Sequence, residues 1–190
     1  MKRSEQGSGL IIVILVISFL LAVGIAVMTV TSTGPRVAGN VRNQEEAFNA
    51  AEAGFEASRR AISDNVDNAV WESFSDHCLR EPTGIDLPFI SGAVNPDYFR
   101  RRTDEEVLTM ILPYKDDPDK VIFYDQPYVR NAEGGDDLRY TYTSFLIDDE
   151  AGGGASDPGD VLLVCIGVVR AGNTILSTAR LEIVFAMQVL

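Results

Sequence analysis

The chain has 190 residues, with 16 lysines and arginines against 28 aspartates and glutamates, which gives a formal net charge of −12. A chain this acidic is a poor ligand for nucleic acid and for anionic lipid headgroups, because both are negatively charged. The length predicts one folded domain in addition to an apolar segment near the N-terminus. We therefore expect cations or basic surfaces as partners of the folded domain, and no nucleic acid.

The first predicted element is a long apolar helix that follows a short polar leader. Residues 10–30 carry no charge and are apolar except for Ser18, Gly24 and Thr29. As a helix this run would span about 31 Å, which matches the hydrocarbon core of a bilayer. A secretory signal peptide would have a shorter apolar region, of roughly 7–15 residues. The run therefore predicts a membrane-spanning helix.

A second, alanine-rich helix is predicted over residues 37–62. Between the two helices, Gly34-Pro35 is expected to interrupt or kink the chain, because proline has no N–H and crowds the preceding turn. Apolar residues recur in the second helix at spacings of 7, 3, 4 and 7, which places them on one face. They are Val41, Phe48, Ala51, Phe55 and Ile62, and we expect this face to pack on a sheet.

The rest of the chain carries signals of a short helix and an antiparallel sheet. Thr103-Asp-Glu-Glu106 is a capping box that begins a short helix. Strand patterns cover residues 121–124, 138–147, 161–169 and 174–185. The last two flank Gly172-Asn173, a hairpin turn signal. We expect a C-terminal antiparallel sheet over about residues 121–189.

The leader resembles the type III signal sequence of type IV pilins. The matching stretch is Lys2-Arg-Ser-Glu-Gln-Gly-Ser-Gly-Leu10. In that family a prepilin peptidase cuts after a glycine that precedes the apolar run and methylates the new amine. The resemblance implies cleavage after Gly7, with Ser8 as the first mature residue, and Gly9 as the alternative.

The amino-acid sequence of the second helix resembles that of the PilX N-terminal family. The matches are Ala38-Gly-Asn40 and Ala47-Phe-Asn-Ala-Ala-Glu-Ala-Gly54, and the resemblance covers roughly residues 1–62. It implies an α+β, type IV pilin-like fold, in which a long N-terminal helix packs on the C-terminal antiparallel sheet. The implied organisation is a leader at 1–7, a transmembrane and filament-core helix at 8–35, and a headgroup at 36–190.

This resemblance implies a minor pilin that acts in the assembly or initiation of a type IV pilus. Most pilins carry a glutamate at the fifth mature position, where this chain has Ile12. A carboxylate in hydrocarbon is costly unless it is paired. In most pilins the amine of a neighbouring subunit is thought to pair with this carboxylate. A subunit at the tip has no neighbour above it to supply that amine, so the missing carboxylate suits a position in a tip or priming complex.

The implied partners are other minor pilins, the major pilin, the inner-membrane assembly platform, the prepilin peptidase and a tip adhesin. The implied location is the inner membrane, crossed once with the C-terminal domain in the periplasm, and later the pilus. Two alternatives stay open. One is a minor pseudopilin of type II secretion, and the other is a single-pass membrane anchor that carries a periplasmic ligand-binding domain.

No catalytic residue and no cofactor is predicted. The single histidine, His77, adjoins Cys78, and adjacent side chains in an extended segment point apart. Cys78 and Cys165 are compatible with one disulfide or with two buried free thiols. An acidic loop offers weak calcium candidates but no EF-hand spacing, so a solvated loop is favoured. These candidates are Asp148, Asp149, Asp157 and Asp160.

Overall fold

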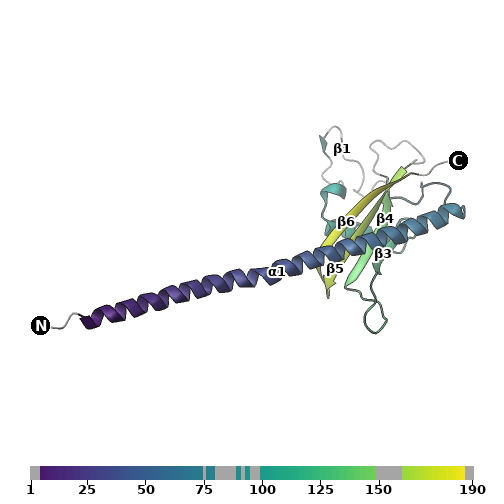
Figure 1. Cartoon of the computed structure of the whole chain (residues 1–190). Coiled ribbons are helices and arrows are strands. Elements are labelled where there is room, and N and C mark those ends of the chain that lie inside the picture. The colour runs from purple at the N-terminus through teal and green to yellow at the C-terminus, as the bar shows by residue number, and fades with distance from the viewer. Residues whose placement is uncertain are drawn as a thin grey trace. The chain divides into compact units, whose positions relative to one another are not determined.

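The computed structural model describes residues 5–74, 76–79, 89–90, 93–94, 99–148 and 160–186. The chain divides into two compact units, residues 1–42 and residues 43–190. A long helix, α1 (Glu5–Asp67), comes first and a four-stranded antiparallel sheet comes last (Figure 1). The α+β arrangement of a long N-terminal helix and a C-terminal antiparallel sheet is the one predicted from the sequence.

The strands of the sheet follow each other in chain order, β3-β4-β5-β6. They are β3 (Val121–Pro127), β4 (Tyr140–Ile147), β5 (Asp160–Ala171) and β6 (Thr174–Ala186). Strands β5 and β6 meet at Gly172-Asn173, where Gly172 has a φ of +61°, as a tight hairpin turn requires. The four predicted strands and this turn are therefore confirmed.

Shorter elements precede the sheet. They are β1 (Phe89–Ile90), β2 (Ala93–Val94), η1 (Phe99–Arg101), α2 (Asp104–Ile111) and η2 (Leu112–Tyr114). The predicted capping box is present at the start of α2. The Thr103 side chain accepts from the Glu106 N–H, and the Glu106 carboxylate accepts from the Thr103 N–H.

Helix α1 continues through Pro35, so the predicted interruption is wrong. A proline removes the one hydrogen bond that its own nitrogen would donate, while the chain on both sides remains helical. The helix also ends later than the predicted Ile62. It reaches Asp67, and the Asn68 side-chain amide then donates to the Asp64 carbonyl at 2.6 Å before Ala69 turns the chain with a φ of +54°.

The face of α1 that packs on the sheet differs from the predicted face. Phe48 and Val41 were expected to be buried, yet they expose 44% and 52% of their surface. Ala51 and Ile62 are buried as expected, and Phe55 is partly buried. The buried positions are mostly small: Ala47, Ala50, Ala51, Gly54, Ser58 and Ile62.

Small residues occupy this face because the backbone of α1 lies very close to β5. A Cβ added to Gly167 would stand 1.9 Å from the Ala47 carbonyl oxygen and 2.5 Å from the Ala51 nitrogen. A Cβ added to Gly54 would stand 2.8 Å from the ring of Tyr142 in β4. The spacing of large apolar residues predicted that Phe48 would be buried. A phenylalanine side chain is too large to fit where the backbones of α1 and β5 are this close.

The two faces of the sheet carry separate apolar cores. Leu146 and Leu163 point to α1, where they pack with Ile62, Trp71 and Phe74. The alternate residues of β4, Phe145 and Ile147, point to the other face and pack with α2. On the α1 side the Ser58 hydroxyl donates to the Ser144 hydroxyl at 2.6 Å, and this buried bond fixes α1 along β4.

Arg180 of β6 attaches α2 to the opposite face. Its Nε donates to Asp104 at 2.7 Å, and its terminal nitrogens donate to the carbonyls of Phe99 and Arg102. The side chains of Arg180 and Asp104 are only 14% and 16% exposed, so this pair is largely removed from water. One guanidinium group therefore donates to three acceptor atoms at or just before the start of α2.

Gly167→Ala is expected to destabilise the protein by about 3 kcal/mol or more, because its Cβ would displace the backbone of α1. Phe48→Ala is expected to cost under about 1 kcal/mol, because the side chain is 44% exposed and lies outside the face packed on the sheet. Chemical denaturation of the full-length protein in detergent micelles, followed by circular dichroism, measures both. Equal losses for the two variants would contradict the buried face described above.

Arg180→Ala is expected to cost about 3 kcal/mol, since it removes the guanidinium donors of the largely buried Asp104 carboxylate and of the segment before α2. Arg59→Ala is the matched control. Arg59 pairs with Glu56 on the exposed side of α1, where both side chains are about half exposed, and its loss should cost less than about 1 kcal/mol. The same denaturation curves compare them, and similar values would show that the Arg180 contacts contribute little.

Candidate functional site

The first unit presents an apolar helix surface. The large apolar side chains between Leu10 and Met28 are all exposed, from 44% at Val23 to 78% at Met28. Among the residues that the structure describes, α1 alone is long and apolar enough to cross a membrane. A helix that is apolar on every side is stable only in lipid or among other apolar helices.

The predicted processing positions lie at the beginning of α1. The backbone of Gly7 and Ser8 is helical. Ile12 follows one turn later, and its apolar side chain is 59% exposed. The cleavage after Gly7 and the methylation of Ser8 stay predictions.

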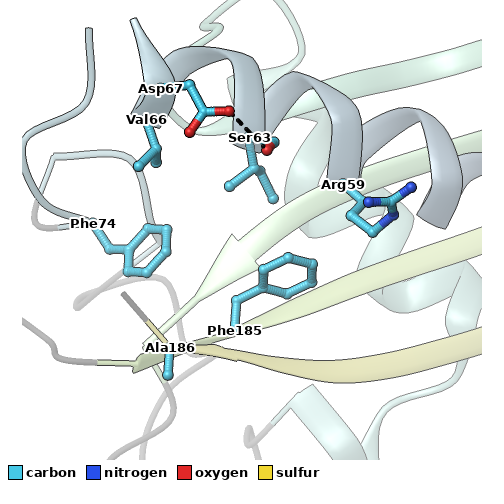
Figure 2. A pocket seen from close by; sticks show the side chains of 8 residues that line it. Arg59, Ser63, Val66, Asp67, Phe74, Phe185 and Ala186 are labelled. Atoms are coloured by element: carbon cyan, nitrogen blue, oxygen red, sulfur yellow. Dashed lines mark hydrogen bonds between the residues drawn. The ribbon is translucent and has the colours of Figure 1, made fainter. Parts of the chain in front are cut away.

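A small pocket lies beside the C-terminal end of α1 in the second unit (Figure 2). Its walls are the side chains of Ile62, Val66, Phe74 and Phe185, with Arg59 and Asp67 from α1 at the border. The Asp67 carboxylate accepts a hydrogen bond from the Ser63 hydroxyl. Figure 2 shows both side chains on the helix, above the rings of Phe74 and Phe185. The cavity volume of about 220 Å³ is below the usual size of small-molecule sites.

The two cysteines are free thiols in this structure and belong to the same apolar core. Cys78 and Cys165 are both fully buried, together with Leu146 and Leu163. Burial raises the pKa of the Cys165 thiol to about 12, against a smaller opposing effect of a hydrogen bond with Ser58. Cys165 is thus a neutral, unreactive core residue at physiological pH.

His77 stacks on an aromatic ring and lies near a carboxylate. Its ring stacks on Trp71 with a centroid separation of 4.2 Å and an angle of 13° between the planes. Its Nδ1 lies 3.1 Å from a carboxylate oxygen of Asp119, although the two do not have hydrogen-bond geometry. Lys120 holds the same segment by donating to the carbonyls of Asp76 and Cys78.

The calcium candidates are only partly placed. Asp149 and Asp157 lie outside the described residues, and for Asp160 only the backbone, at the start of β5, is described. The backbone N–H of Asp148 donates to the Leu79 carbonyl at 3.3 Å. Among the residues whose structure is described, no three histidine, cysteine, aspartate or glutamate side chains gather where they could hold a metal ion.

The close contact between α1 and β5 was not recognised in the sequence, although a signal was present. Gly167 interrupts an otherwise apolar strand, and an isolated glycine in a strand often marks the close approach of another backbone. Its partners Ala47, Ala50 and Ala51 lie inside the motif that resembles the PilX family. The small residues of that motif therefore have a packing role here.

An apolar, membrane-length helix that continues into a small-residue face on an antiparallel sheet defines a membrane-anchored subunit with a pilin-like fold. Residues 6–56 match the family model PilX N-terminal, as the motif indicated, and this match is consistent with a PilX-type minor pilin of a type IV pilus. Comparison with curated proteins and with solved structures found no match.

Alkylation of the native protein with iodoacetamide at neutral pH is expected to modify neither cysteine, because both are buried and the pKa of Cys165 is raised. After denaturation without reductant, both thiols should react. Mass spectrometry counts the modified sites in each state. A denatured protein that reacts only after reduction would show that Cys78 and Cys165 form a disulfide, contrary to the structure.

Proposed function

We propose that the protein is a PilX-type minor pilin that takes part in the assembly or initiation of a type IV pilus. The observation that carries this proposal is the match of residues 6–56 to the PilX N-terminal family, over the stretch where the apolar helix leads into the small-residue face. The proposed role is structural: the protein works by packing and not by chemical conversion.

In this proposal the prepilin peptidase cuts after Gly7, and the apolar helix first anchors the subunit in the inner membrane. The domain after it stands in the periplasm. The assembly platform then moves the helix from lipid into the bundle of helices at the filament core. The exposure of every large apolar side chain between Leu10 and Met28 supports this, since both environments are apolar.

A position in a tip or priming complex is supported by Ile12. A neighbouring subunit's amine would normally neutralise a carboxylate at this place, and an isoleucine needs no such partner. The first subunit of a filament has no neighbour above it, so the apolar side chain removes an electrostatic cost from that position. Other minor pilins, the major pilin and a tip adhesin are the proposed partners.

The second unit also leaves an apolar side chain for a neighbouring subunit. Phe48 is 44% exposed on α1, although the same helix buries alanines against its own sheet. Aromatic side chains of this kind are enriched at protein interfaces. We propose that Phe48 is covered by another subunit in the assembled complex.

Mass spectrometry of the mature protein from cell membranes tests this proposal. The expected N-terminus is an N-methylated Ser8. Gly7→Val should block the processing, and Gly9→Ala should leave the cleavage position unchanged. An intact Met1 in the wild-type protein would contradict the pilin proposal and favour an uncleaved membrane anchor.

A further inference from the structure

Helix α1 changes in intrinsic stability near the border between the two units. Gly34, Pro35 and Gly39 are among the weakest helix formers, and they lie just before the border after Arg42. From Ala47 onward the helix is rich in alanine, the strongest helix former. A helix with this sequence is expected to unwind first in residues 31–42.

At the border, Gln44 attaches α1 to the edge strand β6. Its side-chain Nε2 donates to the carbonyl oxygen of Thr178 at 3.2 Å. Its Oε1 accepts from the hydroxyl of Ser177 at 2.9 Å. Both polar atoms of one amide group are therefore used by two adjacent residues of the same strand.

Glu46 attaches the same turn of α1 to the other edge of the sheet. The hydroxyl of Tyr128, which follows edge strand β3, donates to the Glu46 carboxylate at 3.0 Å. The Tyr128 ring packs edge-on against Tyr140 with a centroid separation of 6.4 Å. Burial raises the pKa of Tyr128 to about 12, with the Glu46 hydrogen bond as a further cause, so the phenol remains a donor at physiological pH.

These two attachments lie on different sides of the helix, because residues two apart in an α-helix are separated by roughly 200°. The next residue, Ala47, is fully buried, and its carbonyl lies over Gly167. One turn of helix is thus held by both edges of the sheet and by its centre.

We propose that Gln44, Glu46, Tyr128 and Ser177 form an edge clamp that stops unwinding of residues 31–42 from spreading into the rest of α1. Unwinding advances along a helix one residue at a time. To pass residue 46 it must break the side-chain bonds on both sides of the helix and uncover Ala47. The clamp thereby defines the residue at which α1 becomes part of the folded second unit.

This inference rests on contacts inside the second unit and not on the proposed function, so each can fail alone. Amide hydrogen exchange of the full-length protein in detergent micelles tests it, with the double variant Gln44→Ala, Tyr128→Phe. Gln44→Ala raises helix propensity, so any faster exchange must come from the lost attachments. Glu52→Ala, an exposed position on the same helix, is the matched control.

We expect the amides of residues 44–50 to exchange about tenfold faster in the double variant, while those of residues 55–62 keep the wild-type rate. The control should leave both sets unchanged. Unchanged exchange at residues 44–50 would overturn the clamp. Equal acceleration over the whole second unit would also overturn it, since the four residues would then act on global stability.

Discussion

The contact between the backbone of α1 and Gly167 of β5 constrains the rest of the second unit. A Cβ at Gly167 would lie 1.9 Å from the Ala47 carbonyl oxygen, so the helix can be this close only because the strand has no side chain there. The close approach requires alanine or glycine at the helix positions nearest to this contact, which are Ala47, Ala50, Ala51 and Gly54. The large apolar residues Ile62 and Phe55 therefore contribute only farther along the helix, where they reach the core that holds Leu163 and Phe185.

This close approach gives the two sides of the helix different roles. The inner side carries mostly small residues and the Ser58–Ser144 hydrogen bond, with Ile62 as a large buried side chain near its C-terminal end. The outer side leaves Phe48 44% exposed, and we propose that another subunit covers it. In a protein that we propose to act by packing, apolar surface that is not used for its own folding remains available for assembly. In the first unit, the large apolar side chains between Leu10 and Met28 are likewise exposed.

Elements that depend on local sequence could be predicted, and those that depend on distant contacts could not. The capping box at Thr103, the turn at Gly172 and the four strands follow from short-range hydrogen bonding and from the alternation of side chains. The orientation of α1 could not be derived from its own periodicity, because a glycine far away in β5 decides which side is buried. The continuation through Pro35 was missed because one lost hydrogen bond was given too much weight. The processing positions came from resemblance alone, as their chemistry belongs to a peptidase.

The measurement that tests this account most directly is a nuclear Overhauser spectrum of the full-length protein in detergent micelles, with selective labelling of alanine, glycine and phenylalanine. The account predicts cross-peaks between the Hα protons of Gly167 and the backbone or methyl protons of Ala47, Ala50 and Ala51. It predicts no cross-peaks between the Phe48 ring and the methyl groups of the sheet. A spectrum in which the Phe48 ring contacts the sheet and Gly167 contacts no helix residue would contradict the account.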